Sequence, residues 1–152
     1  MTWYEFFLFV HITAAVIWLG GAFTFQMYGF VVRRGGDPGE IALFAGRAGH
    51  LSERMFVPAA LTVVVAGIAL MINGNWDWSE WFVALGLVGW AVVSFTAFGY
   101  LSRSLSRVGM RMATEGPSPE LGAEMNRLIL LARTLILILF LVVFVMVVKP
   151  GT

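Results

Sequence analysis

Hydrophobic residues gather into four long stretches of the chain, and polar residues gather between them. The stretches cover approximately residues 3–32, 54–72, 81–101 and 128–148. A helix needs roughly 20 mostly apolar residues to cross a bilayer, and it satisfies its own backbone hydrogen bonds in lipid. The pattern therefore predicts an all-α, polytopic membrane protein. We expect an antiparallel bundle of four transmembrane helices that forms a single domain of residues 1–152.

The polar connections predict how the bundle is oriented. Eight arginines fall in or beside the first and third connections: Arg33, Arg34, Arg47, Arg54, Arg103, Arg107, Arg111 and Arg127. The second connection has no lysine or arginine, and Lys149 is the exception at that end of the bundle. Because positive charge accumulates on the cytoplasmic side, residues 33–53 and 102–127 are expected in the cytoplasm and both termini outside. The expected location is the inner (plasma) membrane of the cell.

Turn residues predict where the helices break at the arginine-rich end. Residues 33–40 are rich in glycine and proline, and residues 41–55 have the pattern of a separate short helix. Residues 102–113 are expected to continue the third membrane helix, with basic side chains facing anionic headgroups. Residues 115–122 are expected to form a mobile turn. Pro58 is expected near the start of the second membrane helix, where its missing N–H group costs little.

Composition excludes several kinds of chemistry. The chain is 59% hydrophobic and 12% charged, whereas a soluble domain is about 25% charged. It has no cysteine, so disulfides and thiolate metal sites are absent. It also lacks a phosphate-binding glycine loop, a zinc-binding motif and paired catalytic carboxylates. The net charge of +1 gives no reason to expect a nucleic-acid partner, and the sequence leaves open whether the protein is an enzyme.

His11 is the residue in the first stretch that most strongly indicates a site. An ionisable side chain inside a membrane helix is costly and usually faces the bundle interior. Helical turns place His11 on the same side as Ala15, Trp18 and Ala22. Small and aromatic residues beside a histidine suit a flat macrocycle, with His11 as the metal ligand. They suit a close seam between two helices equally well, because small residues let membrane helices approach.

Few other side chains are available to complete a haem site. His50 lies at the opposite edge of the bundle, roughly 30 Å from His11, so the two cannot share one haem within a protomer. Met71 and Met146 are the soft ligand candidates expected near the depth of His11. Arg133 suits a porphyrin propionate because a guanidinium matches carboxylate geometry. It suits snorkelling to the headgroups as well.

Three motifs resemble the HemJ-type protoporphyrinogen IX oxidase and CopD-like superfamily of four-helix membrane proteins. They are His11–Ile12 with Trp18 and Gly20–Gly21, Glu53–Arg54 with Pro58 and Gly67, and Val147–Val148–Lys149–Pro150. The chain looks most similar to a branch of integral membrane proteins of unknown function. The resemblance implies that His11 binds haem. The chain departs from HemJ proteins at Leu85, which stands where they carry a lysine early in the third helix.

Two functions are therefore expected from the sequence. The first is binding of b-type haem or a porphyrin through His11, with a redox role and with Trp18, Arg133, Met71 and Met146 as further cofactor-binding candidates. The second is a non-catalytic membrane binding or assembly module in which His11 packs helices together. The lipid bilayer is the expected partner. In a homodimer with its axis along the membrane normal, two copies of His11 would lie at equal depth.

Overall fold

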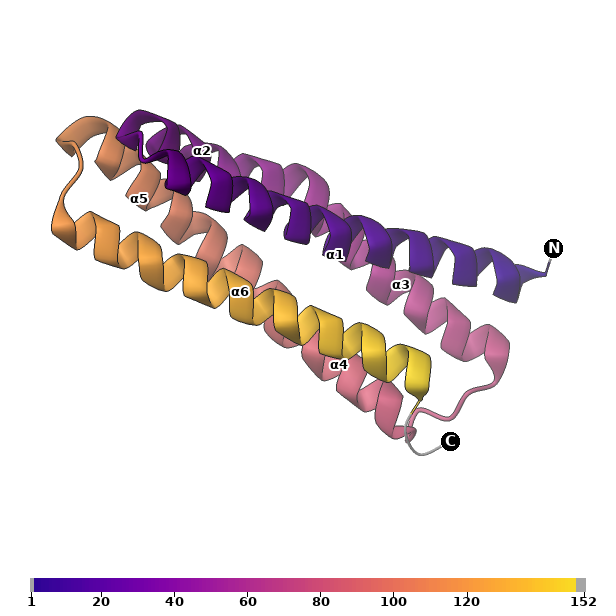
Figure 1. Ribbon diagram of the computed structural model, residues 1–152. Helices are drawn as coiled ribbons and strands as arrows, with labels where there is room; N and C mark the ends of the chain where they lie inside the picture. Colours follow the sequence, from indigo (N-terminus) through magenta and orange to yellow (C-terminus); the bar gives the residue numbers. More distant parts are fainter. Residues whose placement is uncertain (1, 150–152) are drawn as a thin grey trace.

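The computed structural model describes residues 2–149, which form helices and turns without any strand (Figure 1). Four spans are long and apolar enough to cross a membrane, which confirms the predicted all-α bundle. In chain order the elements are α1 (Trp3–Gly35), α2 (Pro38–Leu51), the π-helical segment η1 (Ser52–Phe56), α3 (Val57–Gly74), α4 (Trp81–Ser94), the π-helical segment η2 (Phe95–Leu101), α5 (Ser102–Glu115) and α6 (Pro119–Val148).

The two ends of the bundle differ in what they contain. Both chain termini and the α3–α4 connection lie on one side of the bundle (Figure 1). We term this side the terminal end. The α1–α2 and α5–α6 connections lie at the other end, which we term the arginine-rich end. This up-and-down arrangement is the simplest way to join neighbouring helices by short turns.

Short polar residues set the ends of the helices. Thr2 and Glu5 form a capping box at the start of α1, in which the Thr2 hydroxyl accepts from the Glu5 N–H at 3.2 Å. Gly36 ends α1 in the left-handed conformation with φ of 75°, which favours glycine. The Asp37 carboxylate then accepts from the Gly39 N–H at 2.8 Å and starts α2. The predicted break between these helices is therefore real but shorter than residues 33–40.

The expected break before the second membrane helix is wrong. Helix continues from Pro38 to Gly74 without a turn, so α2 is the first part of the second span and not a separate short helix. Pro58 lies in the first turn of α3, as expected, but α3 is preceded by continuous helix from Pro38 onward. A proline there removes one backbone donor and its ring collides with the carbonyl four residues earlier, at Arg54. The π-helical segment η1 includes Arg54, so the helix is wider at the carbonyl with which the proline ring would collide.

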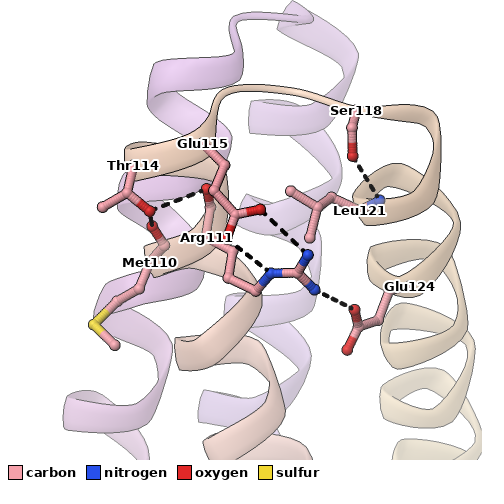
Figure 2. Close-up of polar contacts among 7 residues, drawn as sticks. All are labelled: Met110, Arg111, Thr114, Glu115, Ser118, Leu121 and Glu124. Carbon is pink, nitrogen blue, oxygen red and sulfur yellow. Dashed lines mark hydrogen bonds and ion pairs between the residues drawn. The ribbon is translucent and has the colours of Figure 1, made fainter.

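The expected turn over residues 115–122 is also too long. Helix α6 begins at Pro119, well before the expected residue 128, because the Ser118 hydroxyl accepts from the Leu121 N–H at 3.2 Å and Pro119 occupies the first turn. Figure 2 shows this turn with the side chain of Arg111 between the two helices. Arg111 pairs with Glu115 at 3.2 Å and with Glu124 of α6 at 3.8 Å. Two ion pairs and a cap thus hold a segment expected to be mobile.

Three helix pairs make most of the packing. Helix α3 lies along α1, α2 lies along α5, and α4 lies along α6. The α2–α5 pair is close because small residues face each other, and a Cβ atom added at Gly109 would lie 2.6 Å from the backbone nitrogen of Gly46. The two halves of the bundle therefore rest on different helix pairs, with α2–α5 at the arginine-rich end and α1–α3 at the terminal end.

Candidate functional site

His11 lies in the seam between α1 and α3. Its Nδ1 atom is 2.8 Å from the backbone carbonyl oxygen of Val63. A carbonyl oxygen only accepts hydrogen bonds, so Nδ1 must be the nitrogen that carries the proton. In the neutral imidazole, Nε2 then keeps its lone pair and has no hydrogen-bond partner among residues 2–149. Histidines that bind metals have this same arrangement, in which one ring nitrogen donates to a carbonyl and the other is left for the metal.

Gly67 gives the imidazole the room that it occupies. A Cβ atom added at Gly67 would lie 3.2 Å from Cε1 and 3.4 Å from Nδ1 of His11. The sequence predicted that Met71 of the second span lies near the depth of His11. The structure instead places the imidazole at Gly67 and Val63, which lie one and two helical turns from Met71.

A second ring N–H group binds α3 from the opposite helix. The Nε1 atom of Trp90 on α4 donates to the backbone carbonyl of Ala60 at 2.8 Å. A buried indole N–H group needs an acceptor, and in a membrane helix the backbone is one of few available. Helix α3 therefore accepts one side-chain donor from α1 and one from α4. Sequence reasoning missed Trp90, although a tryptophan in the middle of an apolar stretch is itself a signal that its N–H group needs a partner.

Trp18 lies at a different site, the central cavity of the bundle. This cavity has a volume of about 110 Å³. Trp18 is 5% exposed and stacks on Phe98 of η2 with ring centroids 6.4 Å apart. The polar residues in the cavity wall are Gln26, Ser52 and Ser102, and the rest of the wall is apolar. His11 is not part of this wall, so the structure does not bring Trp18 and His11 into one pocket.

Both π-helical segments contribute to the same cavity. Ser52 and Phe56 come from η1, and Phe98 and Leu101 come from η2. π-Helical turns are rare and are frequent at functional sites. A pocket for a drug-sized ligand has about 300–1,000 Å³, so the central cavity is too small for a haem group. A haem bound by His11 must therefore lie outside this cavity.

The two methionine candidates lie together near the terminal end of the bundle. Met71 is 8% exposed and packs with Phe82 and Val83 of α4, and Met146 of α6 packs against the same cluster. The methyl group of Met146 fills the space beside Gly86. Met71 follows Gly67 by one turn of α3, whereas His11 contacts α3 at Val63 and Gly67. The structure thus gives both methionines a packing position in a cluster that does not include His11.

Arg133 lies on the half of the bundle far from His11. Two contacts set the level of α6 against α1, namely Phe23 with Phe140, whose ring centroids are 6.4 Å apart, and Arg33 with Asn126. Arg133 lies midway between these two α6 residues, at the level of about residue 28 of α1, which is about 25 Å from His11 along the axis. The side chain is exposed. The structure does not bring Arg133 to the His11 site.

The two histidines are separated, although by about 20 Å and not by the roughly 30 Å expected from the sequence. His50 is exposed on the last turn of α2. His11 bonds to Val63, and the helical path from His50 to Val63 is about 20 Å, too long for two ligands of one iron. Across the part of the chain that the structure describes, no group of three or more His, Cys, Asp or Glu residues could hold a metal ion.

The fold and the sites together define a small polytopic membrane protein whose lipid-facing helices surround a narrow apolar core. The chain belongs to the family described as predicted integral membrane protein (DUF2269), which matches residues 5–150. No curated protein and no solved structure matches the chain. The match confirms that the chain belongs to a family of integral membrane proteins, and the likeness to HemJ-type and CopD-like proteins stays a prediction.

Proposed function

We propose that the protein binds b-type haem or a porphyrin in the membrane through Nε2 of His11. The hydrogen bond from Nδ1 of His11 to Val63 supports this proposal, because in the neutral imidazole it leaves Nε2 unprotonated, as an axial ligand must be. Such a haem would supply one-electron redox chemistry. The protein's part is to hold the imidazole plane against α3 and to keep the ligating nitrogen in its basic form.

The volume of the central cavity supports a location at the edge of the bundle. A cavity of about 110 Å³ excludes the macrocycle from the interior of one protomer, so it would lie on the flank of α1 and α3 or between two copies of the chain. In a dimer with its axis along the membrane normal, the second His11 would be at the right depth to supply the other axial ligand. The remote position of Arg133 argues for snorkelling and against a propionate contact.

An absorption spectrum of detergent-purified protein, with haem supplied during expression, tests the proposal. We expect a Soret band and a sharp α band after dithionite reduction. Both bands should be lost in His11→Ala and kept in His50→Ala, which is the matched histidine control. A spectrum without a Soret band in the wild-type protein, or equal bands in wild-type protein and His11→Ala, would contradict haem binding at His11.

A second candidate function is a non-catalytic assembly module. It is favoured because His11 and Trp90 make the same kind of hydrogen bond with the backbone of α3. Both rings donate to carbonyls of α3, and Trp90 has no second nitrogen for chemistry. In this reading His11 holds α1 against α3 and does nothing further. A side-chain hydrogen bond between membrane helices contributes about 0.6–2 kcal/mol, which is enough to matter in a small bundle.

His11→Asn separates the two functions. The Asn amide nitrogen stands close to where Nδ1 of the imidazole stands, so it keeps a donor for the Val63 carbonyl and removes the iron ligand. For the assembly module we expect thermal stability of His11→Asn near that of the wild-type protein, with His11→Ala less stable by about 1 kcal/mol. A haem protein would lose its spectrum in both variants. Equal stability of all three proteins would remove the support for a structural role.

A further inference from the structure

A groove of about 620 Å³ lies between the second half of α1 and α2, near the arginine-rich end. It is separate from the His11 seam and adjoins the central cavity, with which it shares Phe25 and Phe44. One wall carries basic side chains from α2 and η1. The other is made of aromatic and aliphatic side chains, three from α1 (Phe25, Tyr28 and Val32) and three from α2 (Leu43, Phe44 and Leu51). A groove with one charged wall and one apolar wall matches a ligand that is itself charged at one end and apolar at the other.

The charged wall is formed by Arg47, His50 and Arg54, with Glu40 as its acidic residue. All four side chains are exposed. No ion pair within residues 2–149 uses any of them. Two guanidinium groups thus line one groove together with one carboxylate. A guanidinium is planar and matches the oxygens of a phosphate group in a two-pronged hydrogen bond.

Three aromatic rings of the apolar wall pack against one another. Phe25 of α1 stacks on Phe44 of α2 with ring centroids 4.6 Å apart, and Tyr28 meets the edge of Phe44 at 5.7 Å. Gly29 allows this approach, because a Cβ atom there would lie 2.7 Å from the Phe44 ring. Tyrosine rings typically stand at the level of the headgroups in a membrane protein. The apolar wall thus begins at headgroup level and continues into the span.

We propose that this groove binds one anionic phospholipid from the surrounding bilayer, with the phosphate on Arg47 and Arg54 and an acyl chain along Phe25 and Phe44. A free anion would use the arginines and leave the aromatic wall unused. A lipid uses both, and the groove opens on the flank of two membrane-spanning helices where lipid is already present. The volume of the groove is that of a pocket for a drug-sized ligand, which suits a headgroup and the upper part of one chain.

The chain itself supplies a matched control. Arg103 and Arg107 of α5 are exposed, belong to the same end of the bundle and line neither the groove nor the central cavity. Replacing these two residues removes as much positive charge as replacing Arg47 and Arg54. Any difference between the two double variants therefore reports the groove and not the total charge of this end.

The experiment is a titration of purified full-length protein in detergent with phosphatidylglycerol and, separately, with phosphatidylcholine, followed by native mass spectrometry. We expect one phosphatidylglycerol to stay bound, with phosphatidylcholine bound at least tenfold more weakly. Arg47→Gln with Arg54→Gln should weaken phosphatidylglycerol binding by about tenfold or more, because charge-assisted hydrogen bonds are lost. Arg103→Gln with Arg107→Gln should leave the affinity within about twofold of the wild-type value.

A gain-of-affinity variant keeps the test independent of any folding defect. Glu40→Gln removes the groove's negative charge and should strengthen phosphatidylglycerol binding severalfold. Equal weakening by the two arginine pairs would overturn the proposal, as would equal affinity for the two lipids. Displacement of bound lipid by inorganic phosphate at millimolar concentration would also overturn it, because the groove would then be a site for a free anion.

Discussion

At the scale of the residue, the two ring nitrogens of His11 have separate positions and separate uses. Nδ1 belongs to the α1–α3 seam through its hydrogen bond to Val63, and Nε2 is left for whatever approaches the seam. Trp90 makes the same kind of contact with Ala60 and exhausts its one nitrogen in doing so. His11 and Trp90 therefore make similar contacts with α3, but only the imidazole has a second ring nitrogen that could bind a ligand.

Asp77, in the α3–α4 connection, gives a prediction at this same scale. Its carboxylate accepts from the Ser79 N–H at 2.9 Å, which lowers the pKa of Asp77 below its ordinary value of 3.8. A lowered pKa means that the carboxylate stabilises the folded turn above pH 3.8, and that this contribution is lost as the pH falls through the folded-state pKa. In Asp77→Asn the amide oxygen accepts from Ser79 at every pH.

The measurement is the thermal unfolding midpoint of the wild-type protein and of Asp77→Asn between pH 7 and pH 2. We expect the wild-type midpoint to fall more than the variant midpoint below about pH 4. The exposed position of Asp77 keeps this difference small. Parallel curves for the two proteins over the whole range would show that the bond to Ser79 does not stabilise the connection.

At the scale of the element, the α2–α5 contact depends on the absence of side-chain atoms. A Cβ atom at Gly109 would lie 2.9 Å from the backbone oxygen of Ala42 as well as 2.6 Å from the nitrogen of Gly46, and backbone atoms cannot move aside as a side-chain tip can. Ala45, at 0% exposed, belongs to the same contact, since its backbone carbonyl carbon would lie 3.0 Å from that Cβ atom. Close backbone approach of this kind stabilises membrane helix pairs through dispersion contacts.

Gly109→Ala and Gly46→Ala form a matched pair on the two sides of this contact. We expect Gly109→Ala to lower the free energy of unfolding by about 1–3 kcal/mol because it overpacks the seam. A Cβ atom at Gly46 meets nothing within 4 Å, so Gly46→Ala should be neutral or stabilising by up to about 1 kcal/mol through helix propensity. Denaturation in mixed micelles measures both, and equal effects would contradict a tight α2–α5 seam.

The elements also show what the sequence could predict. Hydrophobic length alone predicted the four spans, because a membrane requires them. It did not predict that α2, η1 and α3 form one helix, since Pro58 suggests a helix start and the π-helical turn that accommodates it has no simple pattern. The placement of His11 in a helix seam was one of two predicted readings. The choice of the Val63 carbonyl was not predictable, because all helical carbonyls look alike in sequence.

At the scale of the whole molecule, charge is unequal between the two ends of the bundle. The arginines of α2, η1 and α5 lie toward one end, and Lys149 lies near the other with its ammonium 4.1 Å from the centre of the Trp76 ring. A cation over an indole face is held by that ring, so Lys149 is a poor indicator of sidedness. The positive-inside rule then predicts an orientation with the arginine-rich end in the cytoplasm and both termini outside.

Single cysteines test this orientation, because the chain has none of its own. Ser79→Cys marks the α3–α4 connection and Glu120→Cys marks the start of α6, and both positions are exposed. In intact cells we expect a membrane-impermeant maleimide to label Ser79→Cys and to label Glu120→Cys at least tenfold less. Opening the membrane should make the two equal. The reverse labelling pattern would place the arginine-rich end outside.

The π-helical segment η1 has a consequence for how the second span meets its neighbours. A π-helical turn carries one residue more than an α-helical turn, so the helix beyond it is rotated by roughly 100° relative to an uninterrupted α-helix. This phase offset lets one continuous helix present α2 chiefly to α5 and α3 chiefly to α1. Deleting any one residue of Ser52–Phe56 would turn one of these faces away from its partner by about a quarter of a revolution. The number of residues between Leu51 and Val57 is therefore a stricter requirement of this fold than the identity of any one of them.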